Sequence, residues 1–125
     1  MSTDPPITVQ YYYRVRWGHE AEFLDLFRRN HYPILAEQVS TGRLRSVTVA
    51  RPRFHGDGGA GWNLLVTITY RDWAAVQSHA DAEIARRLFP DQERYRAEEQ
   101  RRFSLLDAHW DVPLEPVELD GPEER

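Results

Sequence analysis

The chain has 125 residues, no cysteine and a formal net charge of −4, with 20 acidic residues against 16 basic residues that are all arginine. The length fits one domain with its own core, and the absence of cysteine excludes disulfides, thiolate nucleophiles and cysteine-bound metals. The negative charge argues against nucleic acid or an anionic membrane as partner, and no apolar run approaches the roughly 20 residues that span a bilayer. Residues 1–6 show no secretion signal, so we expect a cytoplasmic protein.

The first predicted element is a strand at residues 7–17, where apolar and polar side chains alternate. Its apolar face carries Tyr11, Tyr13 and Trp17, and Tyr12 lies on the other face. Aromatic residues on a strand are usual core material and can also line a ligand cavity. The alternation predicts that one face of this strand packs against helices.

A helix is predicted from His19 to the glycine at position 42, because apolar residues recur at helical spacing. The stripe consists of Phe23, Phe27, His31, Leu35 and Val39. Pro33 lies inside this helix and lacks the backbone N–H that an α-helix uses, so we expect a kink near residues 29–32.

Two further strands are predicted at residues 43–54 and 62–70, joined by a glycine-rich hairpin connection at residues 55–61. The first of these strands has no cleanly apolar face. A phosphate-binding loop is excluded at the glycines, because a strand follows them and not the N-terminus of a helix.

The last third of the chain predicts two helical stretches and a strand. Asp72 can cap a helix that continues in a second turn to Leu88, and Pro90 then interrupts it. Residues 91–103 form a charged helix with few residues to bury, so we expect it at the surface. The strand at residues 105–114 has an apolar face made of Leu106, Ala108, Trp110, Val112 and Leu114.

The order of these elements is β-α-β-β-α-β, which is the ferredoxin-like α+β arrangement with a four-stranded antiparallel sheet. The domain covers residues 7–114, between a short tail at 1–6 and an acidic tail rich in proline and glutamate at 115–125. Both helices of this arrangement lie on one face of the sheet. The other face therefore needs a partner or a ligand to cover it.

Three short segments resemble the small dimeric α/β-barrel proteins, which include EthD-like, antibiotic-biosynthesis-monooxygenase-like and NIPSNAP-like members. The segments are residues 17–23, His31-Tyr32-Pro33-Ile34-Leu35 and the glycine at position 42 that leads into a strand. The resemblance implies a homodimer whose two sheets pack face to face into a barrel. It also implies a cavity in each subunit between the sheet and the helices, open to a small aromatic ligand.

His31 is the candidate catalytic residue, because it places an ionisable imidazole in an apolar stripe aimed at the sheet. It could act as a general base on an aromatic or polyketide-like phenol or carbon acid. The alternative is a core histidine that a backbone carbonyl or a tyrosine hydroxyl satisfies. The candidate substrate-binding residues are Tyr11, Tyr13, Trp17, Phe27, Tyr32, Trp62 and Trp110, of which the two strand tyrosines and the three tryptophans are expected to face His31.

Three functions stay open on this sequence. The first is a cofactor-independent oxygenase or isomerase, and the second is a non-catalytic homodimeric ligand-binding or structural module. Haem binding through His31 is the third, although no cofactor is expected. A metal site is not expected either: Asp107, His109 and Asp111 alternate on one strand face, opposite its apolar face, without the spacing of a known ligand set.

Overall fold

The computed structural model describes residues 4–54 and 61–120, and within them the predicted order of elements is confirmed. The strands are β1 (Ile7–Val15), β2 (Leu44–Ala50), β3 (Leu64–Tyr70) and β4 (Leu106–Pro113). The helical elements are α1 (Glu20–Leu26), η1 (Phe27–His31), α2 (Tyr32–Ser40), α3 (Trp73–Gln77), α4 (Asp81–Leu88) and α5 (Gln92–Ser104). The glycine-rich connection predicted at residues 55–61 lies outside the described residues except for Gly61.

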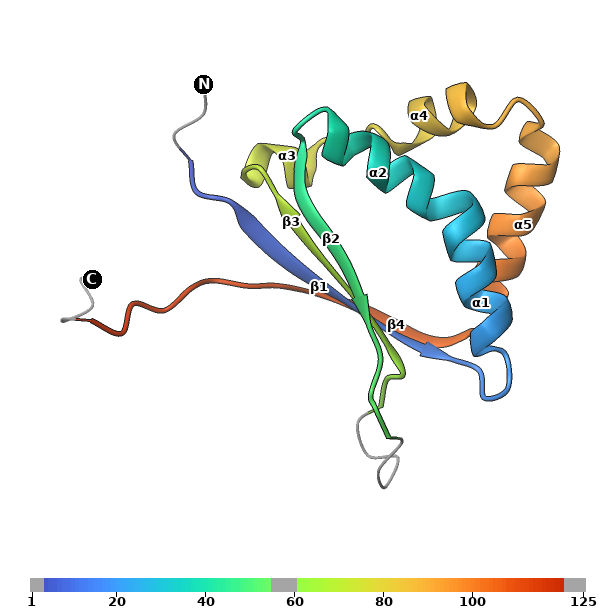
Figure 1. Ribbon diagram of the computed structural model, residues 1–125, viewed down its shortest axis with the longest axis horizontal. Coiled ribbons are helices and arrows are strands. Elements are labelled where there is room, and N and C mark those ends of the chain that lie inside the picture. The colour runs from blue at the N-terminus through green and yellow to red at the C-terminus, as the bar shows by residue number, and fades with distance from the viewer. Residues whose placement is uncertain (1–3, 55–60, 121–125) are drawn as a thin grey trace.

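The four strands form one antiparallel sheet in the order β2-β3-β1-β4. Figure 1 shows the helices gathered on one face of this sheet, with no described helix on the other. This is the ferredoxin-like topology. Among residues 4–54 and 61–120, no helix combines the length and the apolar content that a bilayer crossing requires.

The first helical stretch is interrupted where the sequence predicts a kink. The Tyr32 N–H donates to the Phe27 carbonyl five residues earlier, which makes η1 a π-helical turn between α1 and α2. Pro33 lies in the first turn of α2, directly after Tyr32. A proline costs least there because the first N–H groups of a helix have no partner in the helix. Such π turns change the direction of the side chains that follow, and they place His31 at the end of η1.

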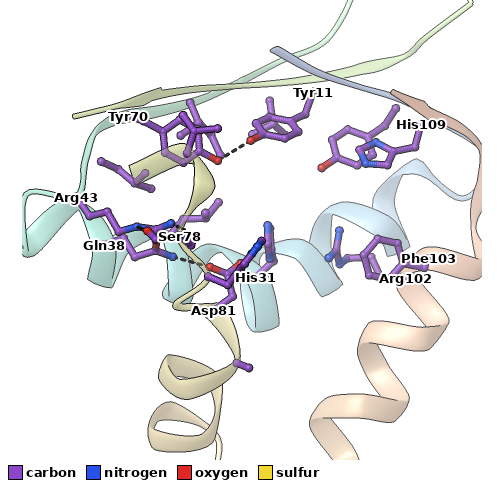
Figure 2. A pocket seen from close by; sticks show the side chains of 18 residues that line it. Tyr11, His31, Gln38, Arg43, Tyr70, Ser78, Asp81, Arg102, Phe103 and His109 are labelled. Carbon is purple, nitrogen blue, oxygen red and sulfur yellow. Dashed lines mark hydrogen bonds between the residues drawn. The ribbon is translucent and has the colours of Figure 1, made fainter. Parts of the chain in front are cut away.

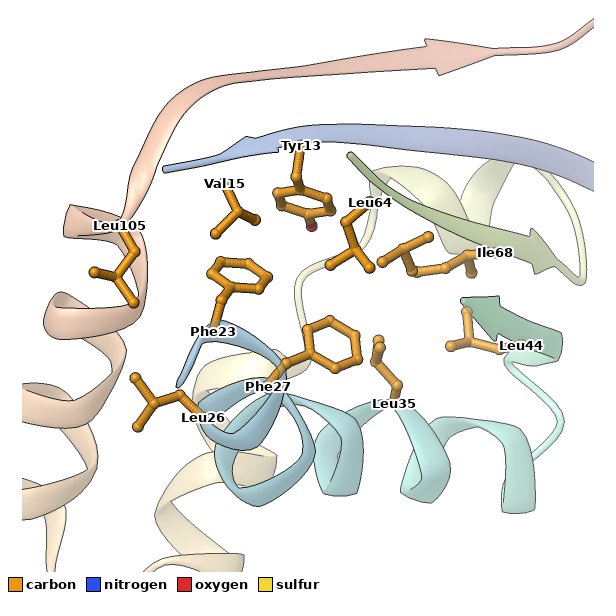
Figure 3. Packing of buried hydrophobic residues seen from close by; sticks show 11 residues of the cluster. Tyr13, Val15, Phe23, Leu26, Phe27, Leu35, Leu44, Leu64, Ile68 and Leu105 are labelled. Atoms are coloured by element: carbon orange, nitrogen blue, oxygen red, sulfur yellow. The ribbon is translucent and has the colours of Figure 1, made fainter. Parts of the chain in front are cut away.

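The core fills the space between the sheet and the helices (Figure 3). Phe23 and Leu105 are completely buried, and Phe27 is 2% exposed. Aromatic rings and branched side chains from both layers interdigitate here, and burial of each stabilises the fold by roughly 1.5–3 kcal/mol. A smaller cluster of Ile34, Ile84 and Ala85 joins α2 to α4.

Beyond Leu106, which packs against the core, the faces of β4 are opposite to the prediction. Tyr12 pairs with Trp110 and Tyr13 pairs with His109, with a register shift between Arg14 and Val15. Directly paired residues of an antiparallel sheet share a face, so Trp110 lies with Tyr12 on the bare face and His109 lies with Tyr13 under the helices. The expectation that Trp110 faces the helices is therefore wrong.

Two other strand predictions need correction. The first strand ends at Val15, so Trp17 lies beyond the sheet and is 79% exposed. In β2 the register shifts between Leu44 and Ser46, which puts Leu44 into the core and separates it from the face of Ser46. Alternation alone assigns faces correctly only where no extra residue interrupts the pairing.

Candidate functional site

A cavity of about 460 Å³ lies between the sheet and the helical layer (Figure 2). Its ceiling is the helix-facing side of the sheet, and its walls come from η1, α2, the α3–α4 region and α5. The lining residues are Tyr11, Tyr13, His31, Leu35, Gln38, Arg43, Leu44, Val66, Ile68, Tyr70, Val76, Ser78, His79, Asp81, Ala82, Arg102, Phe103 and His109. Ser78, His79 and Ala82 are exposed, so the cavity reaches solvent beside the segment that joins α3 to α4.

His31 enters this cavity from the end of η1. Burial lowers its pKa from 6.5 to about 4, the Arg102 cation adds to this effect, and Glu99 and Asp81 oppose it. The edge of the ring meets Phe27 with the ring centres 5.2 Å apart, and no described residue makes a hydrogen bond to either ring nitrogen. The imidazole is therefore neutral near pH 7 and able to accept a proton. Among the residues that the structure describes, no carbonyl or tyrosine hydroxyl makes the hydrogen bond that a satisfied core histidine would have at His31.

The ceiling of the cavity is a row of phenols. The hydroxyl oxygens of Tyr11 and Tyr70 are 2.5 Å apart and share a hydrogen bond. Burial raises the pKa of both tyrosines, and the shared hydrogen bond raises the pKa of Tyr11 further. Burial also raises the pKa of Tyr13 to about 12, against the opposing effect of Arg102. The Tyr13 ring stacks on His109 with 4.5 Å between centres. These phenols stay protonated near neutral pH and act as hydrogen-bond donors.

Arg43 closes one end of the cavity with its donors already in use. It donates to the side chain of Gln38, to the Ala75 carbonyl at 2.5 Å and to Ser78. Gln38 is 2% exposed and donates in turn to Asp81 at 2.9 Å. This network joins β2, α2 and α4 and gives the cavity a fixed polar end.

Arg102 is a site residue that the sequence analysis missed. It lies on α5 and is 2% exposed, whereas Phe103, which the sequence predicts as buried, is 52% exposed. Its Nη2 donates to the Glu99 carboxylate at 2.6 Å, and its guanidinium lies 4.6–5.7 Å from the ring centres of Phe23, Phe27 and Phe103. The inward face of α5 continues from Tyr95 through Glu99 to Arg102, a helical spacing that could have suggested its burial.

The eight predicted site residues fall into three groups. Tyr11, Tyr13 and His31 line the cavity together. Phe27 is buried and its ring contacts His31, but it does not line the cavity. Tyr32 and Trp17 are exposed and also lie outside the lining. Trp62 and Trp110 both pack on Tyr12 at the bare face, with ring centres 5.4 and 5.5 Å away, so the expectation that these tryptophans face His31 is wrong.

The acidic and histidine side chains of β4 do not converge on one point. His109 pairs with Asp111 at 3.4 Å, whereas Asp107 lies 3.7 Å from Arg16. Within the described part of the chain, no three His, Cys, Asp or Glu side chains are arranged to hold a metal ion.

Solved structures resemble the chain closely enough to identify its fold. A NIPSNAP family protein from Agrobacterium tumefaciens is 23% identical, with a TM-score of 0.57 over 96% of this chain and 93% of that one. A dimeric ferredoxin-like protein of unknown function from Thermobifida fusca is 12% identical, with a TM-score of 0.57 over 91% and 93%. The chain has the ferredoxin-like fold of these proteins.

A third protein of similar fold has a described activity. SnoaB, a cofactor-independent oxygenase from Streptomyces nogalater, is 15% identical and has a TM-score of 0.56 over 94% of this chain and 98% of that one. No protein-family model matches the sequence. A comparison with curated proteins also gave no match. The similarity to these solved structures concerns the fold, and the chemistry follows from the residues of the cavity.

Proposed function

We propose that the protein binds a small aromatic molecule in this cavity and that His31 takes a proton from it. The observation that carries the proposal is a buried imidazole that faces a cavity of about 460 Å³ and receives no hydrogen bond from residues 4–54 and 61–120. Ligand sites typically measure roughly 300–1,000 Å³ and combine apolar walls with a few polar groups. Here tyrosine rings supply flat apolar surface and their hydroxyls supply the polar groups.

The reaction begins with transfer of a proton from a phenol or an acidic carbon of the ligand to His31. The product is a phenolate or carbanion beside an imidazolium, and their opposite charges stabilise each other in the buried site. Return of the proton to another atom completes an isomerisation. Attack of the carbanion on dioxygen, followed by return of the proton, gives a hydroperoxide without a cofactor. SnoaB supports the oxygenase form because it is a cofactor-independent oxygenase of the same fold.

A second copy of the chain is the partner we propose for the bare face of the sheet. This face carries the aromatic cluster of Tyr12, Trp62 and Trp110, with Trp110 37% exposed and the neighbouring Val112 36% exposed. Large apolar side chains gathered on one open face are typical of a surface that another protein covers. The Thermobifida fusca protein of this fold is described as dimeric, which supports the same arrangement.

Proton abstraction is tested with the variant His31→Gln and the control His19→Gln, which removes an imidazole outside the cavity. A panel of phenols and aromatic carbon acids is screened in D₂O under air, with exchange of ligand protons followed by NMR and oxygen uptake by an electrode. We expect His31→Gln to lower the rate about 10²- to 10⁴-fold, as loss of a general base does, and His19→Gln to leave it unchanged. Equal rates in both variants would remove His31 as the base.

The non-catalytic alternative gives a different result in the same experiment. A ligand that binds the wild-type protein without proton exchange or oxygen uptake identifies a binding module. Haem ligation by His31 stays a weaker hypothesis, and titration of the protein with haem tests it through the position of the Soret band.

A further inference from the structure

Arg102 has more hydrogen-bond donors than the protein satisfies. Its Nη2 is bound to Glu99, but Nε and Nη1 are buried and have no partner. The three phenylalanine rings around the guanidinium balance its charge only partly and accept no conventional hydrogen bond. Leaving buried donors unpaired costs about 1–3 kcal/mol for each, more when the group is charged. The unpaired donors therefore favour a ligand that brings an acceptor to them.

The guanidinium is directed into the cavity that contains His31. Arg102 lines this cavity, and Figure 2 shows it projecting from α5 on the side away from Arg43. Its charge affects the pKa of both His31 and Tyr13, which lie on other walls. Arg102 is thus the polar group at one end of a space whose middle is lined by aromatic rings.

The charges of Arg43, Arg102, Asp81 and Glu99 sum to zero, so unpaired donors and not net charge favour an anion in the cavity. Arg43 and Arg102 contribute positive charge to the lining, and Asp81 contributes negative charge at the rim. Glu99 lies next to Arg102 and offsets part of its charge, with Oε2 on Nη2 and Oε1 buried without a partner. Every nitrogen of the Arg43 guanidinium already donates to the protein, whereas Nε and Nη1 of Arg102 donate to no described residue.

We propose that Arg102 anchors an aromatic carboxylate, with the carboxylate on the guanidinium and the ring between the tyrosine ceiling and His31. This rests on the proposed function and names its substrate class. A guanidinium binds planar carboxylates especially well because its N–H groups form a fork of matching geometry.

The test compares two ligands of the same shape and different charge. Naphthalene-2-carboxylate and naphthalene-2-carboxamide are titrated by calorimetry into the wild-type protein, Arg102→Met and the control Arg101→Met. Arg101 is the neighbouring arginine, is exposed and pairs with Glu22 at 2.7 Å. We expect wild type and Arg101→Met to bind the carboxylate about 10- to 100-fold more tightly than the amide, and Arg102→Met to lose this preference.

Each outcome decides the inference. Equal affinity of wild type for both ligands overturns it, as does a preference that survives in Arg102→Met, and both results leave the proposed function standing. If neither ligand nor 2-naphthol binds the wild-type protein, the proposed function fails and this inference fails with it. Should Arg102→Met not fold, the NMR signal of the Arg102 Nε–H in wild type replaces it: the carboxylate must shift that signal and the amide must not.

Discussion

Burial of His31 in its neutral form makes the stability of the protein depend on pH. Its pKa is about 4 in the folded protein against 6.5 for an accessible histidine. Below pH 6.5 the unfolded chain binds a proton that the folded protein does not, so stability falls as the pH falls from 6.5 toward 4. Between pH 7.5 and 5.5 these two pKa values give a loss of about 1.3 kcal/mol, and partial contact of the side chain with water reduces it to about 1 kcal/mol.

The measurement is urea unfolding of wild type and His31→Gln at both pH values and one protein concentration, because dissociation of a dimer also contributes to stability. Glutamine cannot be protonated, so the variant lacks this pH dependence, while every other titrating group acts on both proteins alike. We expect wild type to lose about 1 kcal/mol more than His31→Gln on going to pH 5.5. His19→Gln, which removes an imidazole from outside the cavity, serves as the control. If wild type and His31→Gln lose the same free energy, His31 is not held neutral by burial and the argument for a proton acceptor fails.

Two further predictions concern the frame of the site and its assembly. The Asn63 side chain accepts from the Val15 N–H at 2.7 Å and donates to the Val15 carbonyl at 2.8 Å, at the end of β1. Asn63→Ala should therefore lower the free energy of unfolding by about 2 kcal/mol, and Asn63→Asp should lower it by less. A loss under 0.5 kcal/mol for Asn63→Ala in chemical unfolding would contradict this. Wild type should sediment as a dimer at micromolar concentration, and Trp110→Glu, which places a charge on the bare face, should sediment as a monomer. The control Trp73→Ala changes an exposed tryptophan on the helical side and should stay dimeric. A monomeric wild type would refute the proposed cover of the bare face.

The sequence allows the fold to be predicted more reliably than the site. Hydrophobic period depends on local geometry, so the element order and the break near Pro33 can be read directly. Tyr11 and Tyr13 share the cavity face because they lie in an uninterrupted stretch of β1, whereas His31 reaches the cavity from the end of the π-helical turn. The prediction for Trp110 fails because its face depends on an extra residue in β4, Asp107, which shifts the pairing with β1 and which no local pattern encodes.

Arg102 shows a different limit of sequence reasoning. Its helix is charged throughout, and hydropathy assigns an arginine in such a helix to solvent. It is buried because three phenylalanine rings and Glu99 surround it, and these side chains come from α1, η1 and α5. Its unpaired nitrogens become visible only when the hydrogen bonds of the folded protein are counted.

The polar groups of the cavity differ in what they can do with a proton, and this predicts how a ligand is oriented. The raised pKa values of Tyr11 and Tyr13 keep these groups as donors, and Arg102 is a donor at any accessible pH. His31 is a buried acceptor that receives no hydrogen bond from the described residues, whereas Asp81 already accepts from Gln38. A ligand anchored on Arg102 through an anionic oxygen would therefore bring its remaining acidic proton to His31. An aromatic carboxylate that binds but exchanges no proton with solvent D₂O would separate these two roles, leaving Arg102 as an anchor and removing the base.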